Sequence, residues 1–135
     1  MTKARKTKPW KVQEDTATYG SRRFDLEERT FVFAQQVRTF VRGLPRTMAN
    51  IEDAKQLLRA SASVGANYIE ANEALSRKDF AMRIKICRKE AKESAFFLRL
   101  LHTSNVTSLD TERQRLLQEA TELTHIFGAI VTKVS

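Results

Sequence analysis

From residue 26 onward, apolar side chains recur at steps of three and four residues, which places them on one face of an α-helix. The first stripe of this kind consists of Leu26, Thr30, Phe33, Val37, Phe40, Val41 and Leu44. Asp25 is the predicted N-cap, because its carboxylate can accept hydrogen bonds from the free N–H groups of the first turn. Gly43 and Pro45 are expected to end this helix, since glycine is favoured just beyond a helix and proline cannot continue one.

A second amphipathic run extends from about Ile51 to Ala74, with Asn50 as its predicted cap. Its predicted face comprises Ile51, Ala54, Leu57, Leu58, Ser61, Ala62, Gly65, Tyr68, Ile69 and Asn72. The middle of that face is small, and a glycine inside a helix costs about 1 kcal/mol relative to alanine. We therefore expect the backbone of a neighbouring helix to pack tightly against Gly65.

Two further helices follow. Ser76 is the predicted cap of the third, which continues to about His102 with the core stripe Phe80, Ile84, Cys87, Ala91, Leu98 and Leu101. Residues 103–107 form a polar link, and Ser108 or Asp110 is expected to cap the fourth helix. The stripe of that helix is Leu109, Leu116, Ala120, Leu123, Phe127, Ile130, Val131 and Val134.

Four amphipathic helices without strand-like alternation predict an all-α fold, an antiparallel up-down-up-down four-helix bundle over residues 24–135. The preceding residues, 1–23, lack apolar periodicity and are expected to form a flexible basic tail. This tail is either a solubilising leader or an arm that contacts nucleic acid. No apolar run approaches the ~20 residues of a membrane span and no secretion signal is present, so we expect a soluble cytoplasmic protein.

The net charge of +8 is concentrated in two segments. Residues 1–23 hold seven basic and two acidic side chains, and residues 76–103 hold eight and three. On a helical wheel, all but one of the cations in the second segment fall within an arc of about 120°. These are Arg77, Lys78, Lys85, Arg88, Lys89, Lys92 and Arg99. The arc is either an ordinary solvated face or a surface that follows a phosphate backbone. We assign no aromatic residue to it, and so expect binding by shape and charge rather than by base stacking.

The third helix also carries apolar residues outside its core stripe. Met82, Ile86, Phe97 and Leu100 form a second apolar arc, with Phe96 at its edge, and Phe31 and Val32 lie off the stripe of the first helix. The extra arc either packs against both flanking helices or forms a contact between subunits. We favour the subunit contact and expect a homo-oligomer.

Candidate catalytic and metal-binding chemistry is sparse. Cys87 lies on a core stripe and is interpreted as a small buried residue rather than a nucleophile. Glu122 and His125 have the spacing found in di-iron bundles, but such sites need two pairs of this kind, and the only other histidine, His102, has Arg99 three residues before it. We expect no enzymatic activity, no metal or other cofactor and no small-molecule substrate.

Several motifs resemble a known family. Arg59, Ser63, Asn67 and Glu70 fit its Arg-x-x-x-Ser-x-x-x-Asn-x-x-Glu run, Ser76 and Phe80 fit the start of its third helix, and Glu90 and Glu93 fit the Glu-x-x-Glu of that helix. The family is that of the four-helix bundle proteins encoded in intervening sequences of 23S ribosomal RNA genes. The likeness covers roughly residues 24–134.

The resemblance implies a small bundle that assembles as a ring, commonly a pentamer, without catalytic activity. A relative of the family, the accessory variability determinant of diversity-generating retroelements, works with a reverse transcriptase and its RNA template. An accessory role with a reverse transcriptase and RNA is therefore an expectation from the resemblance. For the motif residues two interpretations stay open, namely ties between neighbouring helices or protomers and a ligand or RNA site.

Two hypotheses of function result. In the first, a homo-oligomeric bundle binds nucleic acid, expected to be RNA, through the cations of the third helix and the basic tail. In the second, the protein is an interaction scaffold whose cations meet an acidic partner or keep the assembly soluble.

Overall fold

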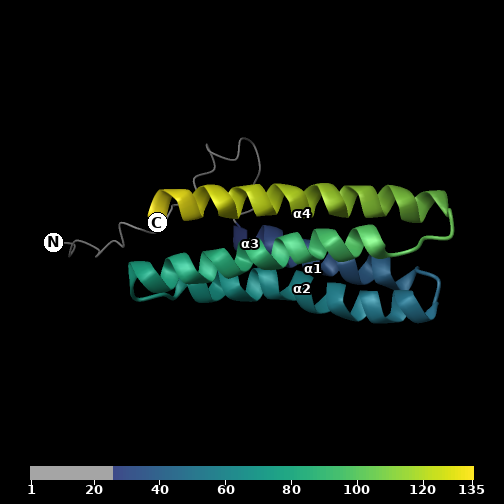
Figure 1. The fold of residues 1–135 in the computed structure, drawn as a ribbon, viewed down its shortest axis with the longest axis horizontal. Helices are drawn as coiled ribbons and strands as arrows, with labels where there is room; N and C mark the ends of the chain where they lie inside the picture. Colours follow the sequence, from purple (N-terminus) through teal and green to yellow (C-terminus); the bar gives the residue numbers. More distant parts are fainter. Residues whose placement is uncertain (1–25) are drawn as a thin grey trace.

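The computed structural model describes residues 26–135, which form four α-helices (Figure 1). These are α1 (Leu26–Arg42), α2 (Met48–Asn72), α3 (Arg77–Leu100) and α4 (Thr107–Val134). None of the residues in this range belongs to a β-strand. The predicted all-α four-helix bundle is confirmed. The predicted cap Asp25 and the expected basic tail, 1–23, lie outside the described residues.

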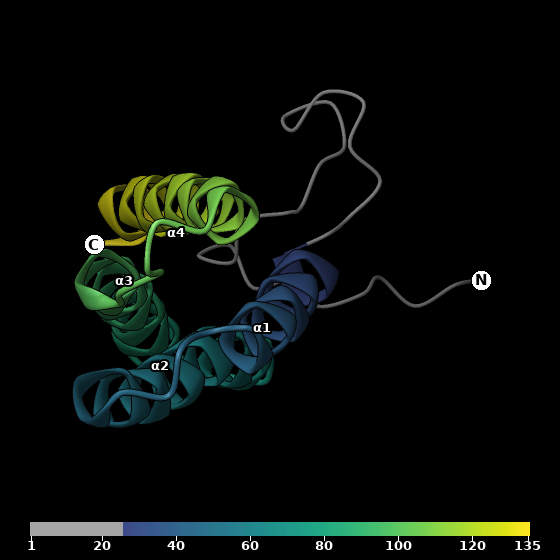
Figure 2. The same cartoon turned by 90° about the vertical axis from the view of Figure 1, so that its right-hand side faces the viewer.

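Short links join the helices, and the chain reverses its direction between α2 and α3 and again between α3 and α4 (Figure 1). Viewed from one end, α3 lies between α2 and α4, while α1 lies beside α2 (Figure 2). Helix α3 packs along both α2 and α4, whereas α1 packs mainly against α2 and touches α4 less. Both flanks of α3 are therefore occupied, and only its outer side is left for solvent.

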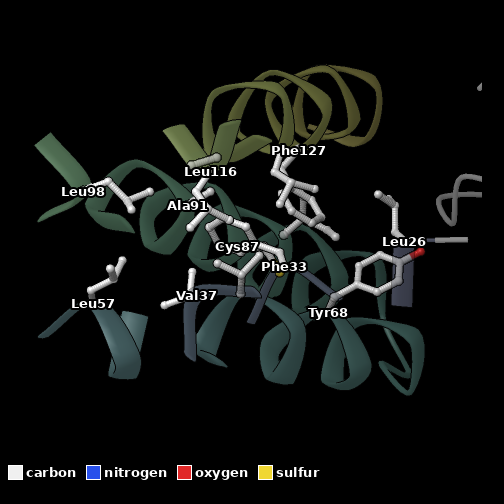
Figure 3. Packing of buried hydrophobic residues seen from close by; sticks show 14 of the residues in the cluster. Leu26, Phe33, Val37, Leu57, Tyr68, Cys87, Ala91, Leu98, Leu116 and Phe127 are labelled. Atoms are coloured by element: carbon white, nitrogen blue, oxygen red, sulfur yellow. The ribbon is translucent and has the colours of Figure 1, made fainter. Parts of the chain in front are cut away.

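The predicted stripes of α1, α3 and α4 meet in the core (Figure 3). Phe33, Phe80 and Phe127, one from each of these helices, are essentially inaccessible to solvent. The ring of Phe127 also packs against Tyr68 of α2, with ring centroids 5.9 Å apart. Burying an aliphatic or aromatic side chain of this size stabilises the fold by ~1.5–3 kcal/mol, so these stripes drive assembly of the bundle.

The predicted face of α2 is partly wrong. Ile51 and Ile69 are 39% and 46% exposed, while Ala60, Val64 and Ala71 are buried. The true core face is rotated away from the two isoleucines. Small residues recur around most of this helix, so its apolar periodicity alone leaves the direction of the core ambiguous.

Asn50 was expected to cap α2, but Thr47 occupies that position. The Thr47 side chain accepts a hydrogen bond of 3.1 Å from the backbone N of Asn50. The buried Asn50 side chain instead donates from Nδ2 to the carbonyl oxygens of Pro45 and His102, at 2.9 and 2.8 Å, and its Oδ1 accepts from the backbone N of His102. It thereby joins the α1–α2 link to the end of α3.

The caps of the last two helices have different outcomes. The cap predicted for α3 is confirmed, because Ser76 accepts from the backbone N of Asp79 at 3.0 Å. The caps predicted for α4 are wrong, since Val106 occupies the cap position and no side chain caps the helix. Ser108 and Asp110 lie inside the first turn. Asp110 accepts a hydrogen bond from the Thr103 hydroxyl, which fixes the preceding link rather than the helix end.

The close approach expected at Gly65 is confirmed, although the neighbouring atoms belong to a side chain. A Cβ at Gly65 would lie 2.9 Å from Thr30 Oγ1 and 3.3 Å from Thr30 Cβ, whereas the nearest backbone atom of Thr30 would be 3.8 Å away. The Thr30 hydroxyl is held in place because it donates to the carbonyl oxygen of Leu26 at 2.8 Å. The glycine thus makes room for α1 to pack on α2.

Candidate nucleic-acid interface

The seven predicted cations of α3 run along its outer side and are called the basic stripe here: Arg77, Lys78, Lys85, Arg88, Lys89, Lys92 and Arg99. Six of them are exposed, and Arg88 is half-buried. The core stripe of the same helix is buried, so cations and core occupy different sides of α3.

Two cations of the basic stripe lie against α4. Arg77 Nε donates a hydrogen bond of 2.7 Å to the carbonyl oxygen of Val134. Arg88 crosses α4 at Gly128, where a Cβ would lie 3.7 Å from Arg88 Cδ. The same Cβ would lie 4.0 Å from Arg88 Nη1, so both the aliphatic stem and the guanidinium of Arg88 lie against α4.

The other cations of the basic stripe make few or no contacts with acidic side chains of the described residues. Within residues 26–135, Lys78, Lys85, Lys92 and Arg99 make no hydrogen bond or ion pair. The exposed Lys89 Nζ lies 3.9 Å from a carboxylate oxygen of the buried Glu90, a long distance for an ion pair. These positive charges are therefore available to an external anion.

The expectation that the basic stripe has no aromatic residue is wrong. Phe96 is 54% exposed and lies four residues after Lys92 and three before Arg99, so it is their neighbour on the helix surface. Its ring packs edge-on against Phe97, with centroids 5.2 Å apart and an interplanar angle of 79°. The sequence interpretation missed this because it grouped Phe96 with the second apolar arc.

An open hollow of about 610 Å³ lies where the start of α3 meets the end of α4. The stripe residues Arg77, Lys78 and Lys85 line it, together with Met82 and the carboxylate-bearing Asp79. The charged side chains that line the hollow are three cations and one carboxylate.

The second apolar arc of α3 is only partly exposed. Met82 and Leu100 are 47% and 50% exposed, as a subunit contact would require. Ile86 is half-buried, and Phe97 is half-buried against the core. Packing within the bundle, the alternative interpretation of the arc, thus accounts for Phe97.

The predicted apolar residues of α1 border a groove. Phe31 is 56% exposed, while Val32 is half-buried. Phe31 and Ile69 line a groove of about 340 Å³ between α1 and α2 whose other walls include Gly65 and three alanines. This apolar surface lies on helices other than α3, apart from the basic stripe.

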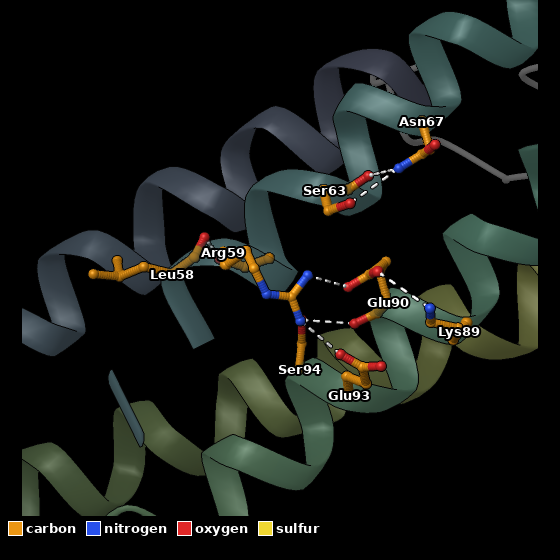
Figure 4. A network of polar contacts seen from close by, with 9 residues as sticks. Leu58, Arg59, Ser63, Asn67, Lys89, Glu90, Glu93 and Ser94 are labelled. Carbon is orange, nitrogen blue, oxygen red and sulfur yellow. Dashed lines mark hydrogen bonds and ion pairs between the residues drawn. The ribbon is translucent and has the colours of Figure 1, made fainter. Parts of the chain in front are cut away.

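The family-motif residues form a polar network between α2 and α3 (Figure 4). Arg59 Nη2 donates to Glu93 Oε1 at 2.8 Å, and its Nη1 donates to Glu90 Oε1 at 3.3 Å. The hydrogen bond to Glu93 is the main reason that the pKa of Arg59 is raised. Glu90 is only 5% exposed, so this contact supplies the counter-charge that a buried carboxylate needs. Arg59, Glu90 and Glu93 therefore tie two helices together.

A second part of the network lies one to two turns further along α2. Asn67 Nδ2 donates to the backbone oxygen and the hydroxyl of Ser63 at 2.9 and 3.0 Å. Asn67 Oδ1 accepts from Arg83 of α3 at 2.9 Å. Glu70 is exposed and pairs with no residue in the described part of the chain, so the helix tie considered for it is not formed there.

The sequence interpretation missed a buried charge cluster. Arg29 of α1 is only 6% exposed. Its Nε donates to Glu119 Oε2 at 2.7 Å, and its Nη2 donates to Glu119 Oε1 at 3.0 Å and to Glu122 Oε1 at 2.8 Å. The hydrogen bond to Glu119 is the largest cause of the raised pKa of Arg29. Of this cluster, the sequence interpretation considered only Glu122, as one half of the Glu122–His125 spacing of a metal site.

Metal and thiol chemistry find no support in the described residues. Across residues 26–135, no three His, Cys, Asp or Glu side chains gather closely enough to hold a metal ion. Cys87 has no exposed surface, as predicted for a core residue, and burial raises its pKa to about 12. Over the same range, no helix has the length and apolarity needed to cross a membrane.

The sequence model of the 23S rRNA-intervening sequence protein family matches residues 22–129. The chain belongs to this family. A solved structure from Bacteroides thetaiotaomicron VPI-5482, a protein with unknown function from the S23 ribosomal protein family, is similar, with a TM-score of 0.68 and 28% sequence identity. That similarity covers 78% of this chain and 96% of the other. No curated protein matches the chain.

The match to the 23S rRNA-intervening sequence protein family includes the whole basic stripe and the Arg59 network. The family resemblance inferred from the motifs is thus confirmed. The relation to diversity-generating retroelements stays a prediction.

Proposed function

We propose that this member of the 23S rRNA-intervening sequence protein family is a non-catalytic, homo-oligomeric protein that binds RNA through the basic stripe of α3. One observation carries the proposal. Lys78, Lys85, Lys92 and Arg99 share the outer side of one helix, and no residue in the described range neutralises them. Cations that contact phosphates release condensed counterions, which favours binding without sequence readout.

Oligomerisation would strengthen this binding. The exposed apolar residues Phe31, Met82 and Leu100 support contact with further copies of the chain, because such groups gain from removal from water. A symmetric ring would repeat the basic stripe, so that several weak phosphate contacts act together. The subunit number of five and the reverse-transcriptase partner, both implied by the family resemblance, remain predictions.

The proposal is tested by measuring RNA affinity against salt concentration for the full chain. We expect log K to fall linearly with log salt, by about 0.7 for each phosphate neutralised on single-stranded RNA. The variant Lys85→Glu/Lys92→Glu should abolish most of this dependence. Both lysines are exposed and without partners in residues 26–135, so their replacement leaves the described packing unchanged.

A charge-matched control separates a local effect from a change in net charge. Lys55→Glu/Lys133→Glu removes the same charge from two exposed lysines on α2 and α4, outside the basic stripe. We expect this control to keep most of the wild-type affinity. Equal loss in both variants, or binding that ignores salt, contradicts the proposal. Retained RNA binding in the stripe variant would show that RNA binds elsewhere on the protein, and a wild type that binds no RNA would favour the interaction scaffold.

A further inference from the structure

We infer that the basic stripe binds a single-stranded polynucleotide, with one base stacked on the ring of Phe96 and the adjacent phosphates on Lys92 and Arg99. This inference rests on the proposed function and deepens it, because it names the form of the nucleic acid. It depends on an exposed aromatic ring among cations that have no ion-pair partner in residues 26–135. This combination is typical of single-strand binding surfaces.

The exposure of Phe96 gives the first argument. The ring is 54% exposed, although the core is well packed and α3 has both of its flanks occupied. Phe97 packs against the core and supports the Phe96 ring edge-on, at a centroid distance of 5.2 Å and an angle of 79°. A ring restrained in this way loses little conformational entropy when a base stacks on it.

The spacing of the neighbouring charges gives the second argument. At a rise of about 1.5 Å per residue, Lys92 lies about 6 Å before Phe96 along the helix axis and Arg99 about 4.5 Å after it. Neither cation is paired with a residue of the described range. A strand running along α3 would therefore place phosphates near cations on either side of the stacked base. A duplex offers the same phosphates but keeps its bases inside, so it cannot use the ring.

The charges also argue against a second copy of the chain as the partner of Phe96. Lys92 and Arg99 flank the ring, and Lys89 lies two helical turns before it. Apposition of two such surfaces would bring like charges together. Glu93, the acid three residues before Phe96 on the same helix, is engaged by Arg59 at 2.8 Å. A polyanion with flat apolar groups matches this surface better than another basic surface does.

The experiment compares fluorescence anisotropy for one unstructured 12-nucleotide RNA, the same RNA as a duplex, the same sequence as single-stranded DNA, and a 12-unit abasic strand. The wild type should bind the single-stranded RNA about tenfold more tightly than either the duplex or the abasic strand. Phe96→Ala should lose this tenfold preference and leave duplex binding unchanged, whereas Phe96→Trp should keep it. Similar affinity for RNA and DNA strands would assign recognition to stacking and phosphate alone, and a preference for RNA would add a contact to its 2′-hydroxyl.

Ile51→Ala is the control, because Ile51 is also an exposed apolar residue, at 39%, and lies on α2 outside the basic stripe and the proposed subunit contact. It should not affect the preference for single strands. Equal wild-type affinity for the RNA strand, the duplex and the abasic strand would overturn the inference while leaving the proposed function standing. A joint loss of single-strand and duplex binding in Phe96→Ala, with a changed oligomeric mass, would assign the ring to a subunit contact and also overturn it. Absence of salt-dependent binding to every probe would overturn the proposed function itself.

Discussion

The side chain of Asn50 holds the backbone of His102 by two hydrogen bonds, donating from Nδ2 to the carbonyl oxygen at 2.8 Å and accepting at Oδ1 from the backbone N at 2.9 Å. The two residues are 52 positions apart in the chain. A third hydrogen bond, from Nδ2 to the Pro45 oxygen, places the same carboxamide at the α1–α2 link. One buried side chain thus joins two connections at one end of the bundle.

Replacing this carboxamide should destabilise the fold. We expect Asn50→Ala to lower the free energy of unfolding by about 3 kcal/mol, because three hydrogen bonds are lost and backbone groups near Asn50 lose partners. Asn50→Asp should cost at least as much, since a carboxylate would face two carbonyl oxygens. Urea denaturation followed by circular dichroism measures both. Gln56→Ala, an exposed amide on the same helix, is the control and should change stability by less than about 0.5 kcal/mol. Equal effects at the two positions would contradict the role of Asn50.

The Arg29 cluster predicts a dependence of stability on its acidic partner. Glu119→Gln should lower the free energy of unfolding by about 3 kcal/mol, because it removes the main counter-charge of a buried guanidinium. The double variant Arg29→Met/Glu119→Gln should be more stable than Glu119→Gln alone, since no buried charge is then left uncompensated. Lys55→Met breaks the exposed pair with Glu52 and serves as a control with a small effect. Additive losses in a double-mutant cycle would count against this explanation.

Gly65 and Gly128, which both lie inside helices, should respond oppositely to replacement by alanine. Gly65→Ala should destabilise by about 1–3 kcal/mol, because its Cβ would meet Thr30 Oγ1 at 2.9 Å. Gly128→Ala should be neutral or stabilising by up to about 1 kcal/mol, since its nearest neighbour, Arg88 Cδ, would be at an ordinary 3.7 Å. Thermal unfolding of both variants checks this. Combining Gly65→Ala with Thr30→Ala should recover part of the loss, and no recovery would show that the hydroxyl is not the obstacle.

The buried thiol of Cys87 should make the folded protein less stable at alkaline pH. Burial raises the pKa of its thiol from 9.0 to about 12, so the folded protein holds this proton more tightly than the unfolded chain. The contribution of the protonated thiol to the free energy of unfolding is therefore fully present below pH 9. It declines as the pH rises toward 12, by at most about 1.4 kcal/mol per pH unit. Unfolding free energies measured from pH 8 to 10.5 should fall more steeply for the wild type than for Cys87→Ala. Parallel curves would exclude this linkage.

The apolar periodicity of the sequence was sufficient to predict the four helices, because each helix buries one apolar face. Phe33, Phe80 and Phe127 lie where their stripes predict. The face of α2 was less certain, since alanine, serine and glycine give a weak contrast between its sides, and Ile69 on the predicted face is 46% exposed.

The polar contacts were harder to predict, because they join residues far apart in the chain. Asparagine is a favoured N-cap residue, so Asn50 was interpreted as a cap. Its hydrogen-bond partner His102 lies in the link that follows α3. Arg29 and Glu119 are 90 positions apart, and local patterns carry no signal of their pairing. The basic stripe was predictable because all its members belong to one helix. The exposure of Phe96 was not, since it depends on which sides of α3 its neighbours cover.

Arg59 influences a surface to which it does not belong. By drawing Glu90 and Glu93 toward α2, it withholds two negative charges from the outer side of their own helix. The electric field that an approaching polyanion meets at α3 is thus more positive than the composition of that helix implies. The positive charge displayed on the surface of α3 thus depends on a residue of α2.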